Sequence, residues 1–206
     1  NRLGMITLDQ QGGLWKITLN RPEKANALTA AMLQELAEIA EAAQQARGLI
    51  ITGAGGVFSA GGDLDEMADG LATSEVWERL STAIAAVPGL SIAALNGTLA
   101  GGAMGMALAC DIRLAVPKAK FFYPVMKRGF LPQPSDPLRM SALIGPARTK
   151  LILMGGQKLS AQEALQFGLI ERVLEPEALL PTAENIAADT IAASPEIARG
   201  IRLLCG

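Results

Sequence analysis

The sequence contains no histidine among its 206 residues. Histidine is the commonest general base and metal ligand, and it is the usual partner of a nucleophilic serine or cysteine. A Ser-His-Asp hydrolase is therefore excluded. The two cysteines, Cys110 and Cys205, lie too far apart in sequence to predict a metal site. Any chemistry must come from carboxylates, lysine, tyrosine and backbone dipoles.

Long apolar runs and strong charge are also missing. The runs at 49–51 and 91–95 are far shorter than the ~20 residues that cross a bilayer. A formal net charge of −2 gives no basic field for nucleic acid or anionic lipid. No secretory signal pattern opens the chain, so we expect a soluble cytoplasmic protein. The four residues before the initiator-like Met5 are either native or added, and nothing is inferred from them.

Half of the residues are hydrophobic and 18% are charged, as is typical of a compact α/β domain. We predict one domain over residues 1–206, with a core at about 5–154 and a shortened helical portion at about 155–206. Hydrophobic periodicity predicts a hairpin, then strands alternating with helices, then mainly helices. The expected strands are 5–8, 14–20, 49–52, 91–95, 112–115 and 170–174. The first helix is expected after a Thr29 cap and to end at Gly48, and further helices are expected at 74–86, 137–144, 146–154 and, after a Ser160 cap, 161–167, with two more near the C-terminus.

Two glycine-rich turns follow predicted buried strands. They run from Phe58 to Leu64 and from Asn96 to Gly105, and each precedes a predicted helix. Such turns could aim two backbone amides at one oxygen, an oxyanion hole in which each donor is typically worth ~2.7–4 kcal/mol. Alternatively, the glycines only permit tight turns and close packing. The dinucleotide-binding pattern fails because Phe58 stands where its third glycine is needed, and no phosphate-loop lysine is present.

Several ordered segments resemble the enoyl-CoA hydratase/isomerase, or crotonase, superfamily. The segments are Leu19–Leu28, Phe58–Leu64, Asn96–Ile112 and Gly155–Ile170. The resemblance implies a ClpP/crotonase fold of repeated ββα units forming a spiral, with a helical C-terminal portion. Peptide hydrolysis, as on the related Clp protease fold, is excluded because the sequence has no histidine.

The resemblance also implies site residues. The oxyanion amides are expected at Ala60 and Gly102, and coenzyme A is expected as part of the substrate, with no tightly bound cofactor. Three residues resemble the loop that meets the adenosine phosphate, and the stretch after Phe58 is expected to hold the adenine end and the pantetheine arm. The expected coenzyme contacts are Lys24, Ala25, Leu28, Ala60, Gly61, Gly62, Asp63 and Leu64. Asp63 also fits as a helix cap, and Lys24 as a solvated loop lysine.

The sequence departs from the family where hydratases carry two glutamates. Gly105 and Val125 stand at those positions, and Gln133 stands where some members carry an aspartate. Asp136 is the remaining candidate for proton transfer, although it also fits as the N-cap of a helix from Pro137. Tyr123, Trp77 and Met67 are interpreted as packing or pocket residues, with packing favoured. Met104, Met106 and Met126 could give an apolar acyl site, although a Met-rich helix is more often part of the core.

These features predict an acyl-CoA thioester enzyme of fatty acid metabolism. Decarboxylation or hydrolysis fits the missing glutamates better than hydration, and isomerisation stays open. The alternative is a non-catalytic CoA-binding or assembly protein. Family members form homotrimers or dimers of trimers and usually continue with further helices, whereas this sequence ends at Gly206.

Overall fold

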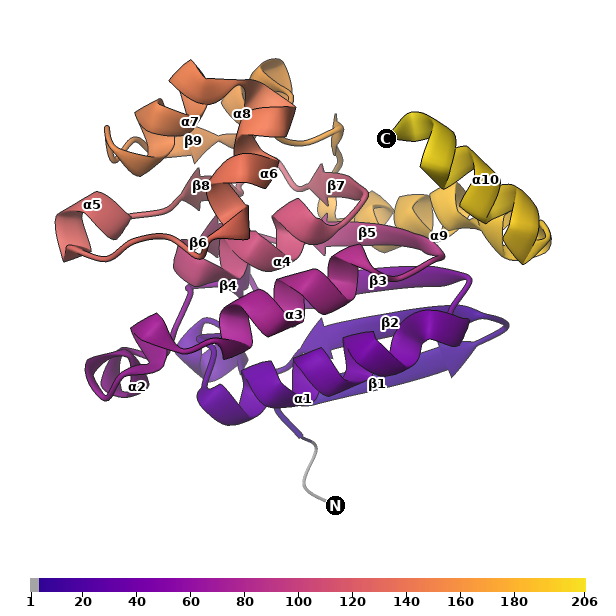
Figure 1. Ribbon diagram of the computed structural model, residues 1–206, viewed down its shortest axis with the longest axis horizontal. Helices are drawn as coiled ribbons and strands as arrows, with labels where there is room; N and C mark the ends of the chain where they lie inside the picture. The colour runs from indigo at the N-terminus through magenta and orange to yellow at the C-terminus, as the bar shows by residue number, and fades with distance from the viewer. Residues whose placement is uncertain (1–3) are drawn as a thin grey trace.

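Two sheets organise the computed structural model, which describes residues 4–206 (Figure 1). The larger sheet has the order β1-β2-β3-β5-β7-β10, and β1 alone pairs antiparallel. Its strands are β1 (Ile6–Gln11), β2 (Leu14–Leu19), β3 (Gly48–Gly53), β5 (Leu90–Leu95), β7 (Ile112–Ala115) and β10 (Arg172–Val173). The smaller sheet comprises β4 (Val57–Ser59), β6 (Thr98–Ala100), β8 (Lys120–Phe122) and β9 (Leu159–Ser160), in that order.

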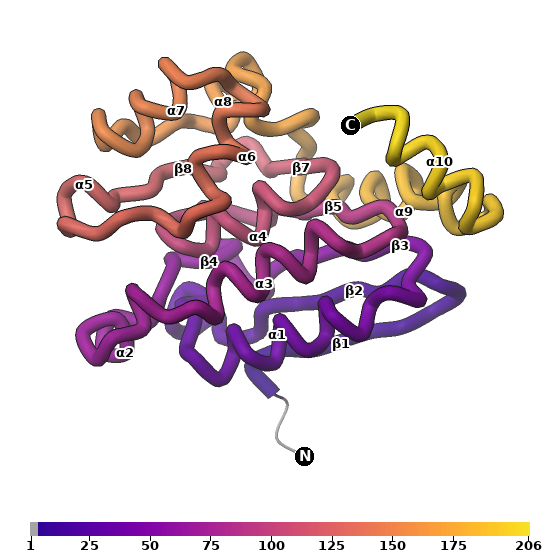
Figure 2. Tube along the Cα trace, in the orientation of Figure 1, coloured from indigo at the N-terminus to yellow at the C-terminus, as the bar shows by residue number. Residues whose placement is uncertain are grey.

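Helices cover both faces of the larger sheet. In Figure 1, α1, α3 and α4 lie side by side on one face, and α9 lies on the other. The tube in Figure 2 shows α7 and α8 beside the smaller sheet, and α10 near the C-terminus. The helices are α1 (Ala30–Ala42), α2 (Leu64–Ala68), α3 (Val76–Ala85), α4 (Met104–Ala109), α5 (Val125–Arg128), α6 (Ser135–Ile144), α7 (Pro146–Leu153), α8 (Ala161–Phe167), α9 (Pro176–Ala192) and α10 (Pro195–Cys205). Short 3-10 turns are η1 (Pro22–Lys24), η2 (Ala43–Gln45), η3 (Leu71–Thr73) and η4 (Gly101–Ala103).

The predicted pattern of strands and helices is largely confirmed. The hairpin β1–β2 forms, and Thr29 caps α1 by accepting a hydrogen bond from the Met32 amide at 3.1 Å. β3 and β5 are buried along most of their length, as expected for strands covered on both faces. Gly48 was expected to end the first helix, but it begins β3, because α1 ends at Ala42 and η2 follows.

A strand–strand–helix step recurs along the chain, and this recurrence confirms the expected fold class. In each step the first strand joins the larger sheet and the second joins the smaller one: β3 and β4, then β5 and β6, then β7 and β8. A helix start follows the second strand each time. The second strands pair in parallel, so the ends of these strands and the helix starts gather at one place. This place holds the candidate site.

No helix within residues 4–206 combines the length and the apolar character that a membrane crossing requires. The prediction about the residues before Met5 falls mainly on residues 1–3, which lie outside the described part of the chain.

Candidate functional site

Two asparagine side chains fix the path of the loop between β3 and β4, which leads into the first glycine-rich turn. Asn26 is fully buried, and its Nδ2 donates hydrogen bonds to the carbonyl oxygens of Ala54 (3.0 Å) and Val57 (2.8 Å). The Oδ1 atom of Asn96 accepts a hydrogen bond from the Gly53 amide at 2.9 Å. Buried amides of this kind satisfy loop backbone groups that no regular structure pairs. The loop between β3 and β4 is therefore held rigidly beside the second glycine-rich turn.

The two glycine-rich turns lie against each other. A Cβ atom on Gly61 would lie 3.1 Å from the carbonyl oxygen of Ala100 and 3.4 Å from the Cα of Gly101, and Gly61 has a positive φ of 97°. A Cβ atom on Gly97 would collide with the carbonyl oxygen of Gly56. Glycine is thus required at both positions for the backbones to meet. The turns serve close packing, as the simpler interpretation predicted, and they also converge on one cavity.

The amide of Ala60 already has a protein acceptor. Its N–H donates to the carbonyl oxygen of Ala25 at 2.9 Å. A donor engaged in this way is not free for a ligand oxygen, so the expectation that Ala60 supplies an oxyanion amide is wrong. Ala60 instead contributes to the wall of the cavity.

Gly62 and Gly102 carry the amides without protein acceptors in this part of the site. Within residues 4–206, neither N–H donates to another protein group, and Gly102 lies in the first turn of a helical segment, where N–H groups lack intrahelical partners. Both glycines lie against one indole. An added Cβ would be 3.3 Å from Cζ2 of Trp77 at Gly62 and 2.8 Å from Cζ3 at Gly102. The indole itself is fixed by a 2.9 Å hydrogen bond to the Leu71 carbonyl oxygen.

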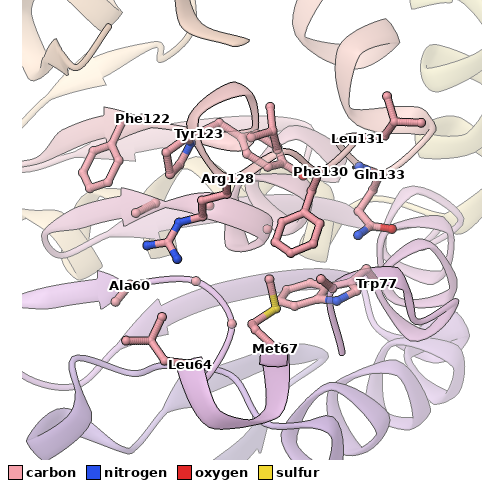
Figure 3. Close-up of a pocket in the computed structure, with 18 residues that line it drawn as sticks. Ala60, Leu64, Met67, Trp77, Phe122, Tyr123, Arg128, Phe130, Leu131 and Gln133 are labelled. Atoms are coloured by element: carbon pink, nitrogen blue, oxygen red, sulfur yellow. Dashed lines mark hydrogen bonds between the residues drawn. The ribbon is translucent and has the colours of Figure 1, made fainter. Parts of the chain in front are cut away.

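The cavity lies between the helix α2 region and the segment around α5 (Figure 3). Its wall is largely apolar and aromatic, and it includes both glycine-rich turns. Arg128 supplies the single charged side chain of this lining. The lining residues are Ala60, Gly61, Gly62, Leu64, Met67, Ala72, Trp77, Ala100, Gly101, Gly102, Phe122, Tyr123, Pro124, Val125, Arg128, Phe130, Leu131 and Gln133. An apolar cavity with a few convergent polar groups is the usual form of a small-molecule site.

Tyr123 joins this cavity to a buried carboxyl group. Its hydroxyl donates to Oδ2 of Asp136 at 2.8 Å, and Asp136 has no exposed surface. The Oδ1 atom has no hydrogen-bond partner among the described residues, and it lies 2.8 Å from where a Cβ on Gly105 would be. The Asp136 carboxyl therefore fills space that a side chain at position 105 would otherwise occupy.

Burial changes the acidity of both members of this pair. It raises the pKa of Asp136 to about 6, and the nearby Glu78 carboxylate adds to the rise, while the Tyr123 hydrogen bond opposes it. Burial, followed by the Asp136 charge, raises the pKa of Tyr123 far above its usual range. The prediction that Asp136 caps a helix is wrong. It lies inside the first turn of α6, whose N-cap is Pro134 without a side-chain hydrogen bond.

Asp63 acts as the helix cap that the simpler interpretation predicted. Its Oδ1 accepts hydrogen bonds from the amides of Asp65 (3.1 Å) and Glu66 (3.2 Å) at the start of α2. Its Oδ2 pairs with Arg21 at 2.9 Å, and the hydrogen bond from this guanidinium holds the pKa of Asp63 below its usual value. The carboxylate is thus occupied by protein donors.

Some of the remaining predicted residues line the cavity, and others lie in the core or on the surface. Lys24 is exposed in η1, Ala25 is half-buried, and Leu28 is fully buried, so the Leu28 side chain cannot contact a ligand. Met104 and Met106 lie in the core and not in the cavity, as the simpler interpretation predicted, so they form no acyl site. Met126 lies in a neighbouring surface groove outside the cavity, so the expectation that it contributes to an acyl site is wrong. Trp77 and Met67 line the cavity, and the Trp77 ring also belongs to the core.

Comparison with known proteins decides the family. A model of the enoyl-CoA hydratase/isomerase family matches residues 9–202. A short-chain-enoyl-CoA hydratase of Clostridium acetobutylicum is 33% identical over 94% of this chain and 77% of its own length. The chain belongs to the enoyl-CoA hydratase/isomerase family. This confirms the resemblance drawn from the ordered segments, and it places the chain among acyl-CoA-processing proteins.

Other relatives widen the range of reactions within the family. An ethylmalonyl-CoA decarboxylase of Pongo abelii is 30% identical, with 97% of this chain and 70% of that protein covered. The crystal structure of an enoyl-CoA hydratase/isomerase from Pseudoalteromonas atlantica superposes with a TM-score of 0.90 at 29% identity, covering 98% of this chain and 82% of that one. A family of this breadth leaves the reaction to be argued from the site itself.

For this family member, sequence reasoning missed three features of the site. Gly62 was expected as a coenzyme contact, whereas its amide has no acceptor among the described residues. Tyr123 was interpreted mainly as a packing residue, and Arg128 was not considered. A charged pair, Lys127-Arg128, within an otherwise apolar and glycine-containing segment was a signal that could have drawn attention to the last of these.

Proposed function

We propose that this protein is an acyl-CoA-processing enzyme in which the amides of Gly62 and Gly102 bind the thioester carbonyl oxygen. The supporting observation is that Gly62 and Gly102, whose N–H groups have no acceptor among the described residues, both line one apolar cavity, and that both glycines lie against the Trp77 ring. Each such donor is typically worth ~2.7–4 kcal/mol when charge develops on the oxygen. Rigid glycine turns position the donors before the ligand arrives, so little reorganisation is needed during reaction.

The coenzyme portion would extend along the mouth of the cavity. Ala60, Gly61 and Leu64 line this region, and the exposed Lys24 lies on the loop whose Ala25 carbonyl binds the Ala60 amide. A lysine ammonium in this setting can pair with a phosphate as a flexible point charge. We therefore keep Lys24 and the 60–64 stretch as the proposed coenzyme contacts, with Leu28 supporting them from the core.

Proton transfer is assigned to Tyr123 backed by Asp136. When the Asp136 carboxyl is protonated, it can donate to the Tyr123 oxygen, which frees the phenolic O–H to point into the cavity. In a decarboxylation, the bond from the α carbon to the leaving carboxylate breaks and carbon dioxide departs. The electron pair of the broken bond forms an enolate, whose oxygen is held by the two amides. Tyr123 then gives its proton to the α carbon while Asp136 returns one to Tyr123, and the Asp136 carboxylate takes up a proton from solvent before the next turnover. This step needs no glutamate at Gly105 or Val125.

The amide assignment has a direct test in solution. Amide resonances of Gly62 and Gly102 should move downfield when butyryl-CoA is added to 15N-labelled protein, because both would donate to the same carbonyl oxygen. The Ala60 amide, already bonded to Ala25, serves as an internal control. Thioester binding without movement at either glycine would refute the arrangement.

The reaction class has a separate test. We expect turnover of malonyl-type thioesters and slow hydration of crotonyl-CoA. Rapid hydration of crotonyl-CoA would show that positions 105 and 125 are not the determinants we propose.

A second candidate function is non-catalytic binding of acyl-CoA. It is favoured by the position of Asp136, which has no exposed surface and reaches the cavity only through Tyr123. Exchange of the α protons of butyryl-CoA in D2O separates the two functions. Binding with no exchange and no turnover of any thioester would support the binding protein.

We further propose assembly with copies of this chain, as a homotrimer or a dimer of trimers. The support is an exposed apolar groove beside α5, α6 and α7, where Leu131 is 89% and Leu138 is 75% exposed. Light scattering coupled to size-exclusion chromatography tests this proposal, and a monomer at micromolar concentration would oppose it.

A further inference from the structure

Arg128 places a positive charge in the wall of the cavity that also holds the two glycine amides. Its side chain extends from α5 towards Ala60 and Leu64 on the opposite wall (Figure 3). Within residues 4–206, its guanidinium makes no hydrogen bond and no ion pair, whereas Arg21, Arg79, Arg113 and Arg202 each pair with a carboxylate. A guanidinium is always charged and fits a carboxylate or phosphate with two parallel hydrogen bonds.

The surroundings of Arg128 offer no anion from the protein. The cavity lining contains no aspartate or glutamate, and the nearby Asp136 carboxyl is fully buried behind the Tyr123 ring. The wall residues Phe130, Leu64 and Met67 are apolar and offer the guanidinium no polar partner, and the Arg128 side chain is itself exposed to solvent. An anionic group of the ligand is therefore the natural partner of Arg128.

Two parts of an acyl-CoA could supply this anion. The phosphates of coenzyme A lie at the far end of the pantetheine arm from the thioester, whereas Arg128 shares one cavity with Gly62, Gly102 and Tyr123, which act at the thioester and the α carbon in the proposed function. The geometry thus favours a charge close to the reacting carbons.

We infer that Arg128 selects acyl-CoA thioesters whose acyl group carries a free carboxylate, by pairing with that carboxylate. This inference rests on the proposed function, because it uses the position of the thioester at Gly62 and Gly102. The preference for a charged acyl group comes from one exposed side chain at the cavity, while the glycine amides bind the thioester whatever the acyl group is.

Isothermal titration calorimetry with three ligands tests the inference. Succinyl-CoA and butyryl-CoA have acyl groups of the same length and differ by a terminal carboxylate in place of a methyl group, and free CoA retains every phosphate. The proteins are the natural sequence, Arg128→Gln, and the matched control Lys127→Gln, which removes an exposed charge from the preceding residue outside the cavity lining. Circular dichroism verifies that each variant is folded.

The natural protein should bind succinyl-CoA about tenfold more tightly than Arg128→Gln does, a modest loss in keeping with a partly solvated charge pair. Lys127→Gln should match the natural protein for all three ligands. The difference in succinyl-CoA affinity between the natural protein and Arg128→Gln should shrink as the salt concentration is raised.

Three results would overturn the inference. Equal loss of affinity for succinyl-CoA, butyryl-CoA and free CoA in Arg128→Gln would assign Arg128 to the coenzyme phosphates. An unchanged succinyl-CoA affinity in that variant would leave the guanidinium without the proposed partner. Failure of every thioester to bind the natural protein would overturn the proposed function as well, so the two failures are distinguishable.

Discussion

Replacing Asp136 with asparagine should stabilise the protein at alkaline pH. The native carboxyl keeps its proton up to about pH 6, whereas the ordinary aspartate pKa is 3.8. Between these values the native state binds more protons than the unfolded state, so the stability contributed by this group falls as the pH rises through the window and then levels off. Asparagine keeps the shape and an oxygen acceptor for Tyr123, and it carries no charge to bury.

The magnitude follows from the difference between the two pKa values. A tenfold change in proton affinity corresponds to about 1.4 kcal/mol, so the ionised carboxylate costs the native state about 3 kcal/mol at pH 8 and about 1 kcal/mol at pH 4.5. Solvent does not screen this electrostatic cost, because Asp136 has no exposed surface. The stability advantage of Asp136→Asn over the natural sequence should therefore grow by about 2 kcal/mol between pH 4.5 and pH 8.

Urea unfolding followed by circular dichroism at the two pH values measures this growth. Asp9→Asn is the control for replacing an aspartate, because Asp9 lies exposed on β1 and does not line the cavity. If the difference in unfolding free energy between Asp136→Asn and the natural protein is the same at pH 4.5 and pH 8, the carboxyl ionises as it does in solvent. The account of the buried pair then fails.

Four further outcomes are expected. Tyr123→Phe leaves Asp136 without a donor, so its pKa should rise further and the free energy of unfolding at pH 8 should fall by about 1–3 kcal/mol in urea titrations. In the natural protein, turnover of malonyl-type thioesters should decline about tenfold per pH unit above about pH 6, because the protonated carboxyl is the active form. The Asp136→Asn amide cannot return a proton to Tyr123, so this variant should turn over slowly and without that dependence in a pH–rate profile. Gly102→Ala places a Cβ 2.8 Å from the Trp77 ring, so thioester affinity should fall at least tenfold in calorimetry, with about 1–3 kcal/mol lost in stability. Gly97→Ala drives a Cβ into a facing carbonyl oxygen, and its thermal unfolding midpoint should drop by several degrees or more, as seen by circular dichroism.

The sequence predicted the scaffold well because its signals are local. Alternating and continuous apolar runs mark β2, β3, β5 and β7, and the Thr29 and Ser160 caps mark helix starts that the structure reproduces. The short strands of the smaller sheet were not predicted. They are two or three residues long, and their pairing depends on contacts between distant segments, which periodicity does not record.

The site was predicted in outline and missed in detail. The glycine-rich turns drew attention to the correct loops, but which amide stays free depends on a contact from elsewhere in the chain: the Ala25 carbonyl takes the Ala60 donor. The positive φ at Ala25, 51°, and the buried Asn26 beside it hold that carbonyl in place. No spacing rule within the Phe58–Leu64 segment contains this information. That the Ala60 amide is engaged by the Ala25 carbonyl oxygen could therefore be seen only with the fold in hand.

The contact between Gly105 and Asp136 explains how a missing side chain on one helix can be replaced from another. Gly105 on α4 leaves a space that the Asp136 carboxyl on α6 enters, and a Cβ at position 105 would lie 2.8 Å from its Oδ1. A glutamate at 105 and a buried aspartate at 136 would place two acids in one small volume, where like charges strongly oppose joint ionisation. The two arrangements thus exclude each other. The Asp136 carboxyl reaches the cavity only through Tyr123. Activation of a water molecule requires that the water contact its base directly or through one other water. The arrangement therefore suits proton delivery to a carbanion better than activation of water. Asp136 can therefore be buried only because position 105 has no side chain, and both features favour chemistry that ends in protonation of an enolate.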